Sequence, residues 1–591
     1  MTTENYWTRF QRNRLSRRRI LSGAAWGTAG IATAALVGCG DDGDDSGEPT
    51  SASTTSTSSS GGASPTAEQP KGYQTNFAEP STQPKAGGTM RIANDWDVSI
   101  LDPIKTAAGG TIVKCNIVYN RLISLNTGVT APDDKEIKLV SDLSGLPEQP
   151  DGQTFTFKIN PGIKWQNVAP LNGRAFKAED VKYAYERYAT AQGSVHTTYF
   201  RDIDKIEAID DTTLKITLKT PNPDFLIPLG TRYLTIFPRE LVDAGTIETQ
   251  AVGTGSMILK EMAKSDHVTL AKNPDYFKGA AKLDGVEFRI QPDAASRLAA
   301  FRAGQVDFSY GLLGNKRDAD NLLQTNKDVN INISPPFAAI FGLSLNLDDP
   351  RFQDERVRQA LMLGMDRETM VQIIYDGFGT TIPTIPWTYI YASQPKPEQF
   401  GKWWKHDPAE AKKLLAAAGQ ENLSFQVIYH EYTASGNTQQ LEIMSDLYKQ
   451  IGIDMKVQRV PYTEFNSQWI QRTFPEATDG WQALGFEPNN YFYNHIHSTS
   501  PGNRWRIKDS ELDAWAEKQR SELDKNARKE IWKQIFDKVL DKAYRIDKPS
   551  GTGFTAYQPW LHGLRFGGPL GSNSSYYEWG QQMHQAWLDK A

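Results

Sequence analysis

Hydrophobic residues alternate with polar ones in several short segments of the chain and recur at helical spacing in others. In the segment 154–159, Phe155, Phe157 and Ile159 fall on one face, which predicts a strand. A helix is expected to begin near Ala178, because apolar residues follow it at three- and four-residue spacing. The face that this helix buries is expected to hold Ala178, Val181, Ala184, Tyr185 and Tyr188.

The same patterns predict a folded body that mixes strands and helices. Further strands are expected at 88–93, 206–210, 214–218, 282–290, 341–347, 425–429 and 453–460, the second and third forming a hairpin. Further helices are expected at 294–303, with Leu298 and Phe301 inward, at 408–418, around 441–448, and at 510–522 and 526–544. The strands of the strand-helix-strand segment 425–460 should be parallel, with a right-handed crossover. The tail 549–591 shows little periodicity and is expected to be surface coil with short strands.

Residues that begin or end helices lie at the edges of these patterns. Asp354 is expected to cap one helix and Asp407 another, with Pro408 in the first turn of the second. Glu410 completes a capping-box-like pattern with Asp407. Gly419 is expected to end that helix, because glycine readily adopts the left-handed backbone conformation.

Residues 16–39 combine a basic patch, an apolar run and a cysteine in the order of an export signal. Arg17–Arg19 give the consecutive-arginine pattern of twin-arginine export, and residues 20–38 contain no acid or base. Leu36–Cys39 resembles a lipobox, whose cysteine is lipidated and becomes the mature N-terminus. A transmembrane helix is the alternative, since the run approaches the ~20 apolar residues that span a bilayer. The glycines, the basic flank and the cysteine favour a lipoprotein signal peptide over residues 1–38.

The composition that follows predicts a flexible tether and a net acidic mature chain. Acidic residues and then a Ser/Thr/Gly/Pro-rich run occupy 39–85, and such a segment cannot bury enough apolar surface to offset its ordering entropy. Its ~46 residues give a mean reach of roughly 35–40 Å; a mucin-like stalk is the alternative. The chain has 65 basic and 70 acidic residues, and removing residues 1–38, with six Arg and one acid, leaves a net charge near −10. This charge disfavours nucleic acid and anionic lipid headgroups, so we expect membrane attachment through acyl chains on Cys39.

Neither reactive cysteine chemistry nor a catalytic motif is indicated. With Cys39 lipidated, Cys115 has no disulfide partner and is expected to be a buried, inert thiol. No GxxxxGK[ST], GxSxG, HExxH or CxxC motif occurs in the sequence. His495 and His497 lack a third metal ligand and are expected in polar surface or loop. We therefore expect no enzymatic activity, no cofactor and no metal site.

Four blocks, in order, resemble the family 5 extracellular solute-binding proteins of ABC importers, which include dipeptide-, oligopeptide- and nickel-binding proteins. The first block is 151–187, and the second contains 253–255 and 273–277. The third is 354–361 with 365–367, and the fourth is 407–415. The resemblance extends over roughly residues 88 to 545, which is most of the expected folded body.

The resemblance implies an α/β fold, a two-lobed periplasmic-binding-protein clamp (type II, cluster C) with a small additional domain. Lobe I would comprise 86–125, 250–335 and 546–591, the inserted domain 126–249, and lobe II 336–545. A small-molecule solute between the lobes would favour the closed state, and the closed form would deliver it to an ABC permease and ATPase complex. We expect a monomer, exported and lipid-anchored at the outer face of the cytoplasmic membrane, on the cell surface or in the periplasm.

Aromatic residues in irregular segments beside Pro and Gly are candidates for solute contacts, because loops at a cleft present their side chains. The candidates are Trp96, Asp97, Arg232, Tyr233, Trp387, Tyr389, Trp481, Glu487, Asn489, Asn490 and Tyr491. In peptide-binding relatives, an acid just before a GDPDN-like stretch pairs with the free amino group of the peptide. Here 487–492 resembles that stretch, but 483–486 contain no acid, and Asp479 lies farther upstream. This departure makes an oligosaccharide or another neutral solute an alternative to a peptide.

Two functions of other classes stay open at this point. A secreted hydrolase would need a paired acid and base in the cleft. A non-transport solute receptor would signal to a membrane sensor when its lobes close.

Overall fold

The computed structural model describes residues 73–74, 83–95, 97–98, 100–126, 138–334, 341–384, 387–430, 436–481, 488–564 and 578–590. The chain divides into Met1–Pro70 and Lys71–Ala591, and all described residues belong to the second unit. The predicted signal peptide with Cys39 and most of the predicted tether lie outside the described residues, as do Trp96 and Glu487.

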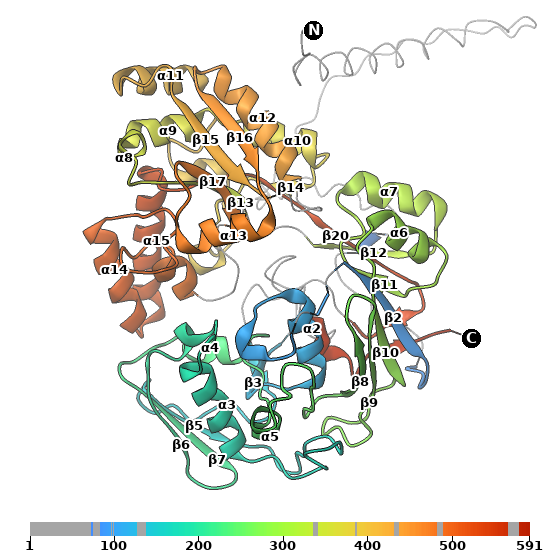
Figure 1. Cartoon of the computed structure of the whole chain (residues 1–591). Coiled ribbons are helices and arrows are strands. Elements are labelled where there is room, and N and C mark those ends of the chain that lie inside the picture. Colours follow the sequence, from blue (N-terminus) through green and yellow to red (C-terminus); the bar gives the residue numbers. More distant parts are fainter. Residues whose placement is uncertain are drawn as a thin grey trace, which may run out of the picture. The chain divides into compact units, whose positions relative to one another are not determined.

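An eight-stranded sheet gathers strands from distant parts of the chain (Figure 1). Its order is β1 (Tyr73–Gln74), β12 (Asn330–Ser334), β20 (Gly553–Tyr557), β11 (Phe308–Ser309), β2 (Thr89–Asn94), β10 (Gly285–Ile290), β9 (His267–Lys272) and β8 (Met257–Ala263). β2 pairs in parallel with β10 and β11. Helices α6 (Ala294–Arg302) and α7 (Lys316–Thr325) share a hydrophobic cluster with the sheet, to which Phe301 contributes as predicted, whereas Leu298 is only partly buried.

The C-terminal tail contributes a central strand to this sheet, so the expectation of surface coil is wrong for β20. This strand lies between β12 and β11, antiparallel to both, and Phe554, Ala556 and Tyr557 are buried. Its five residues are too few to display a clear periodicity, and its partners are distant in sequence. The expected short strands of the tail are present as β21 (Leu561–His562) and β22 (Trp587–Leu588), which pair with each other, and the short helix η6 (Glu578–Gln582) lies between them along the chain.

A five-stranded sheet is built mainly from the second half of the chain. Its order is β16 (Asp454–Arg459), β15 (Ser424–Tyr429), β17 (Ala477–Trp481), β13 (Phe341–Leu345) and β18 (Ile546–Asp547). β15 and β16 are parallel and joined through α12 (Asn437–Lys449), which confirms the predicted parallel pair. Four of the five residues of β13 are buried without alternation, because this central strand is covered on both faces.

Helices surround this sheet along most of its length (Figure 1). They are α8 (Pro350–Gln353), α9 (Glu355–Leu363), α10 (Arg367–Ile374), α11 (Pro408–Ala417), α13 (Tyr462–Gln471), α14 (Ser510–Ser521) and α15 (Lys525–Asp541). The pair β14 (Gly379–Thr380) and β19 (Ser550–Gly551) lies where the chain leaves β18. Asp354 and Asp407 cap α9 and α11 as predicted. The capping-box role of Glu410 is wrong, since its carboxylate instead accepts from Lys413 Nζ at 3.0 Å.

A smaller α/β part is formed by residues 138–249 together with β3 (Ile123–Leu125). Its sheet is β5 (Thr154–Lys158), β7 (Thr213–Leu218) and β6 (Ile203–Ala208), with β6 and β7 forming the predicted hairpin. Helix α3 (Ala178–Thr190) buries the five residues that its spacing predicted. The remaining elements are β4 (Leu139–Ser141), α4 (Leu226–Leu229) and α5 (Arg239–Asp243).

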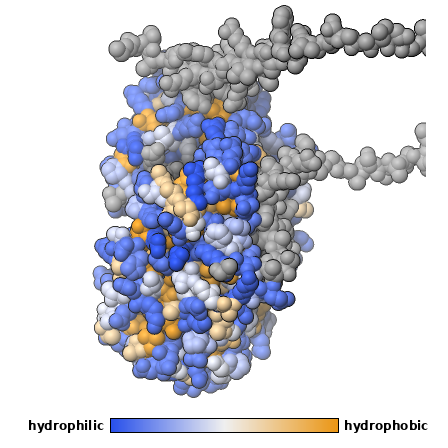
Figure 2. All heavy atoms as spheres, turned by 90° about the vertical axis from the view of Figure 1, so that its right-hand side faces the viewer, coloured by the Kyte–Doolittle hydropathy of each residue, from blue (hydrophilic) through white to orange (hydrophobic). Residues whose placement is uncertain are grey.

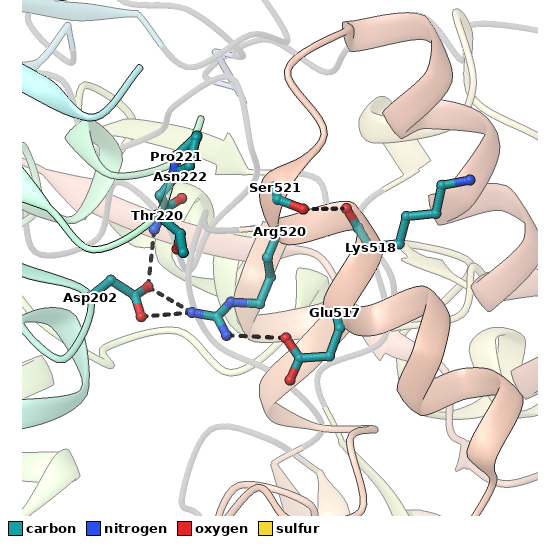
Figure 3. Close-up of a pocket in the computed structure, with 8 residues that line it drawn as sticks. All are labelled: Asp202, Thr220, Pro221, Asn222, Glu517, Lys518, Arg520 and Ser521. Carbon is teal, nitrogen blue, oxygen red and sulfur yellow. Dashed lines mark hydrogen bonds and ion pairs between the residues drawn. The ribbon is translucent and has the colours of Figure 1, made fainter. Parts of the chain in front are cut away.

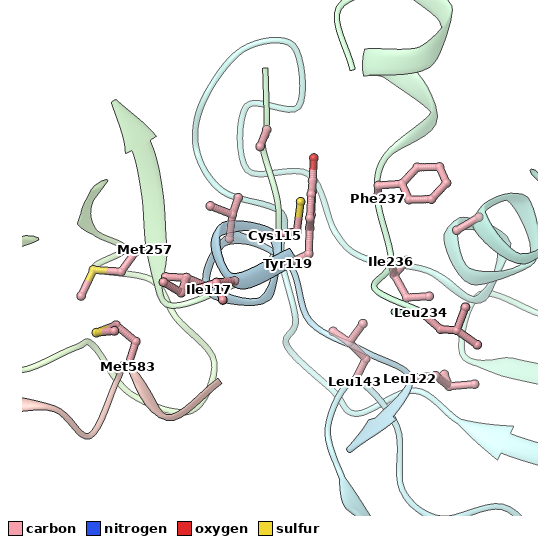
Figure 4. Close-up of a cluster of buried hydrophobic side chains, with 14 of the residues drawn as sticks. Cys115, Ile117, Tyr119, Leu122, Leu143, Leu234, Ile236, Phe237, Met257 and Met583 are labelled. Carbon is pink, nitrogen blue, oxygen red and sulfur yellow. The ribbon is translucent and has the colours of Figure 1, made fainter. Parts of the chain in front are cut away.

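Helix α2 (Gly109–Val118) lies in a hydrophobic cluster that joins this smaller part to the eight-stranded sheet (Figure 4). Cys115 is buried there as a free thiol, as predicted, and burial raises its pKa to about 12. The C-terminal end of α2 lies directly against Gly253 and Gly255. A Cβ on Gly253 would lie 1.9 Å from Val118 O, and one on Gly255 would lie 2.5 Å from the same atom. Both positions therefore require glycine.

The surface seen in Figure 2 is mostly hydrophilic, with hydrophobic residues in small separate groups. Among the described residues, none of the helices combines the length and the apolar character needed to cross a membrane.

Candidate functional site

Asp97 lies half-buried in the loop that follows β2. Its carboxylate accepts hydrogen bonds from Ser265 Oγ and Val98 N, each at 2.7 Å. Burial raises the pKa of Asp97, but these hydrogen bonds outweigh burial and the pKa is lowered. Lys114 of α2 is 2% exposed, and its Nζ lies 4.4 Å from the centre of the Phe288 ring. Burial lowers the pKa of Lys114 to about 7, although the charge of Asp97 acts in the opposite direction.

Arg232 and Tyr233 pack on each other within the smaller α/β part. The guanidinium of Arg232 lies 4.6 Å from the ring centre of Tyr233, and its Nη2 donates to Tyr233 Oη at 2.8 Å. The backbone oxygen of Arg232 accepts from Asn116 of α2, and that of Tyr233 accepts from Tyr188 of α3. These contacts hold the pair between two helices.

The candidate residues around Tyr389 and around Asn489–Tyr491 meet at a cluster of three rings. We call these rings, Tyr389, Phe492 and Trp532, the aromatic cluster. Phe492 stacks on Trp532 with ring centres 5.2 Å apart and an angle of 13° between the planes. Tyr389, in the short helix η3 (Trp387–Tyr389), lies 5.4 Å from Trp532 and 6.4 Å from Phe492. Trp387 and Tyr491 are both buried.

Gln519 of α14 connects the aromatic cluster to the π-helical turn η5 (Asn490–Asn494) and the residue before it. Its Nε2 donates to Asn489 Oδ1 at 2.8 Å, and its Oε1 accepts from Trp532 Nε1 at 2.9 Å. Oε1 also accepts from Arg528 Nη2 at 3.2 Å. Because both ends of the carboxamide are engaged, the orientation of Gln519 is determined and Asn489 is held in place.

A cavity of about 380 Å³ lies between α14 and the smaller α/β part (Figure 3). Its lining comprises Asp202, Thr220, Pro221, Asn222, Glu517, Lys518, Arg520 and Ser521. Arg520 Nη2 donates to both carboxylate oxygens of Asp202, at 2.8 and 2.7 Å. The guanidinium of Arg520 also lies 4.6 Å from the ring centre of Tyr493. Most of the residues that line the cavity are charged or polar, and the ion pair connects its two sides.

Asp479 does not offer a free carboxylate. It lies in β17 and forms an ion pair with Lys548 at 2.7 Å, and both side chains are fully buried. Burial raises the pKa of Asp479 and lowers that of Lys548, while the partner charge opposes each shift. Trp481 ends the same strand, where it pairs with Phe341 of β13.

His497 is engaged by neighbouring side chains. Its ring stacks on Tyr493 with centres 4.7 Å apart, and its Nε2 lies 3.4 Å from a Glu517 oxygen. The ring of His495 lies 5.6 Å from that of Trp505. Within the ranges that the structure describes, no three His, Cys, Asp or Glu side chains form a group suited to a metal ion.

The structure therefore brings Tyr389 together with the segment that contains Asn489, Asn490 and Tyr491, whereas Asp97 and the Arg232–Tyr233 pair belong to other clusters. Sequence reasoning missed Gln519 and Arg528. A signal was present, since both polar residues fall on the buried stripes of α14 and α15, which contain Leu512, Ala516, Ile531 and Trp532. A polar residue on such a stripe indicates a buried partner.

Comparison with known proteins shows which family this chain resembles. The family model described as "Bacterial extracellular solute-binding proteins, family 5 Middle" matches residues 143–503. The heme-binding protein A of Haemophilus influenzae is 26% identical over 497 residues, which cover 78% of this chain and 86% of that protein. The glutathione-binding protein GsiB of Escherichia coli K12 is 30% identical over 334 residues, 55% of this chain and 62% of GsiB.

A solved structure shows the same fold. The periplasmic binding protein DppA from Helicobacter pylori, in complex with the peptide STSA, superposes with a TM-score of 0.71 at 22% identity. The superposition covers 86% of this chain and 99% of DppA. The expected fold class, a two-lobed α/β clamp of the type II periplasmic binding proteins with an additional domain, is confirmed.

Proposed function

Because the family model covers more than half of its length, the chain belongs to the bacterial extracellular solute-binding proteins of family 5, and we propose that it is the substrate-binding lipoprotein of an ABC importer. It captures a peptide-like or other small solute between two lobes and delivers it to a membrane permease. No bond of the solute is changed. What matters is the difference in solute affinity between the closed and the open state.

The observation that carries the proposal is that the chain passes twice between its two large sheets. β12 leads into β13, and β18 leads back into β20, so two segments cross between the eight-stranded and the five-stranded sheet. Two short connections between the same pair of sheets are suited to a hinge, because a few residues can absorb the change in backbone angles. We assign lobe I to 86–125, 250–335 and the tail, the inserted domain to 126–249, and lobe II to 336–545. Since β18 pairs with β13, we extend lobe II to Asp547.

We assign solute contacts first to Tyr389 and to the neighbouring residues Asn489–Tyr491, and then to Asp97 and Arg232. Rings with polar groups at their edges bind solutes that carry apolar surface and hydrogen-bonding groups. The peptide in the DppA complex and the glutathione for which GsiB is named support a peptide-like solute. Because Lys548 engages Asp479, we propose that recognition does not depend on a free α-amine. An oligosaccharide is the alternative for the same reason.

Mass spectrometry of solute that co-purifies with the chain from its native source tests the proposal most directly. We expect one dominant solute, heat of binding when it is added back to stripped protein, and a smaller radius of gyration in its presence by small-angle scattering. Scattering that stays the same with every solute of a broad peptide and sugar library, together with no heat of binding, would refute the proposal.

We further propose that Cys39 carries the lipid that holds the protein at the outer face of the membrane. Cys39→Ser should release the protein into the soluble fraction, whereas Cys115→Ser, which removes the buried thiol, should leave it in the membrane fraction. Membrane retention of the Cys39→Ser variant would contradict the lipobox assignment without affecting the solute-binding proposal.

A further inference from the structure

The contacts between the inserted domain and lobe II include two ion pairs between residues that are distant in sequence. Arg520 of α14 binds both oxygens of Asp202 (Figure 3), and Arg528 of α15 donates from Nη1 to Asp224 Oδ1 at 2.6 Å and from Nη2 to the other oxygen. The side chains of Arg528 and Asp224 are each 6% exposed. Those of Arg520 and Asp202 are 17% and 24% exposed. We call these two ion pairs the domain contact.

The inserted domain belongs to the body of lobe I rather than to that of lobe II. One hydrophobic cluster contains Phe157 and Val181 of the inserted domain together with Ile92 and Phe288 of the eight-stranded sheet. Separating these residues would expose a shared core, whereas separating the domain contact exposes charged groups that water solvates readily. When the lobes move apart, the inserted domain therefore stays with lobe I, and the ion pairs of the domain contact separate.

The domain contact is connected to the proposed solute segment through Gln519. Arg528 donates from Nε to the backbone oxygen of Gln519 at 2.8 Å and from Nη2 to its Oε1 at 3.2 Å. The other end of the same carboxamide donates to Asn489. Arg528 thus reaches Asp224 on one side and, through a single side chain, Asn489 on the other.

We propose that the domain contact forms on closure and that Gln519 is the positioning residue that couples it to the segment 488–494, so that the inserted domain takes part in gripping the solute. The inference rests on the proposed function. When Asp224 leaves, Arg528 loses its carboxylate partner and its interaction with Gln519 is free to rearrange, which releases Asn489. When the segment is held by solute, the same hydrogen bonds present Arg528 to Asp224.

A distance measurement in the ligand-free full chain tests the first half of the proposal. Spin labels at Lys205→Cys on β6 and Gln534→Cys on α15 report the separation across the domain contact by pulsed electron resonance. We expect a short and a long population in the wild type. The double variant Asp202→Asn and Asp224→Asn should lower the short-to-long ratio at least tenfold, and Asp537→Asn, which removes an exposed ion pair on α15, should leave it unchanged.

Two outcomes would overturn the closing role of the contact. A single, unchanged distance in the wild type and the double variant would mean that the contact is a static interface. Absence of the short distance in the wild type would mean that the contact does not form in solution. Raising sodium chloride from 50 mM to 1 M in the wild type gives a second measurement that needs no variant, and it should move the ratio in the same direction.

Amide hydrogen exchange at 488–494 tests the coupling through Gln519. The Asp202→Asn and Asp224→Asn changes should raise exchange there at least tenfold with Gln519 present, and by less than twofold in the Gln519→Met background. An equal increase in both backgrounds, or none in either, would overturn the role of Gln519. These readouts need no solute, so their failure is distinguishable from failure of the proposed function, which the co-purification experiment measures.

Discussion

The ammonium group of Lys114 lies in α2 among apolar side chains, and we expect Lys114→Met to stabilise the protein at neutral pH. The side chain is 2% exposed and lies over the ring of Phe288. Methionine has a similar length and no charge, so it can occupy the same space without the cost of burying an ammonium group.

The magnitude follows from the pKa of this lysine. Burial lowers the pKa from 10.5 to about 7, and the charge of Asp97 offsets this shift only in part. Between these two values the unfolded chain binds more protons than the folded chain, so the free energy of unfolding rises with pH across that window. One pKa unit corresponds to about 1.4 kcal/mol, so this group should add about 2 kcal/mol to the stability of the wild type between pH 7 and pH 9. Below pH 7 the cost of burial is present in full.

Urea unfolding of the wild type and Lys114→Met, followed by tryptophan fluorescence at pH 7, 8 and 9, measures this effect. We expect the variant to be more stable at pH 7, with its advantage shrinking by about 2 kcal/mol by pH 9. The exposed Lys205→Met is the matched control and should show no such pH dependence. An advantage that does not vary with pH would refute the reasoning, because it would mean that Lys114 keeps its ordinary pKa in the folded chain.

Three further predictions concern stability and reactivity. Arg187→Ala should cost about 3–5 kcal/mol in urea unfolding, because it leaves the fully buried carboxylate of Asp102 without its bidentate partner; a loss below about 1 kcal/mol would mean that the pair behaves as a surface ion pair. Gly253→Ala should cost at least about 3 kcal/mol, since the added Cβ meets a backbone oxygen of α2, whereas Gly145→Ala, with open space around it, should change stability by less than about 0.5 kcal/mol. Cys115 should resist iodoacetamide in the native protein at pH 8 and react after unfolding in urea, because burial raises its pKa to about 12; rapid native labelling, detected by mass spectrometry, would contradict its burial.

Elements whose signals are local could be predicted from the sequence. The five apolar positions of α3 are the five that it buries, because the spacing of side chains on a helix depends only on its geometry. Asp354 and Asp407 cap their helices for a similar reason, since the hydrogen bond spans two or three residues. The resemblance over four blocks gave the fold class, which the comparisons confirm.

Features that join distant segments could not be predicted. β20 is a central strand because β11 and β12 flank it, and nothing in its five residues specifies those neighbours. Asp479 lies upstream of the segment 487–492 in the sequence, and only the fold shows that Lys548 pairs with it.

The sequence by itself determined many of the strands and helices, the caps Asp354 and Asp407 and the family resemblance, because periodicity and capping act within a few residues along the chain. The tertiary structure decided which of these elements lie side by side, and with that the partners of Arg528, Gln519 and Asp479. The physical reason is that a buried polar side chain is satisfied by whichever group the packing brings within hydrogen-bonding distance, and that choice depends on the whole fold.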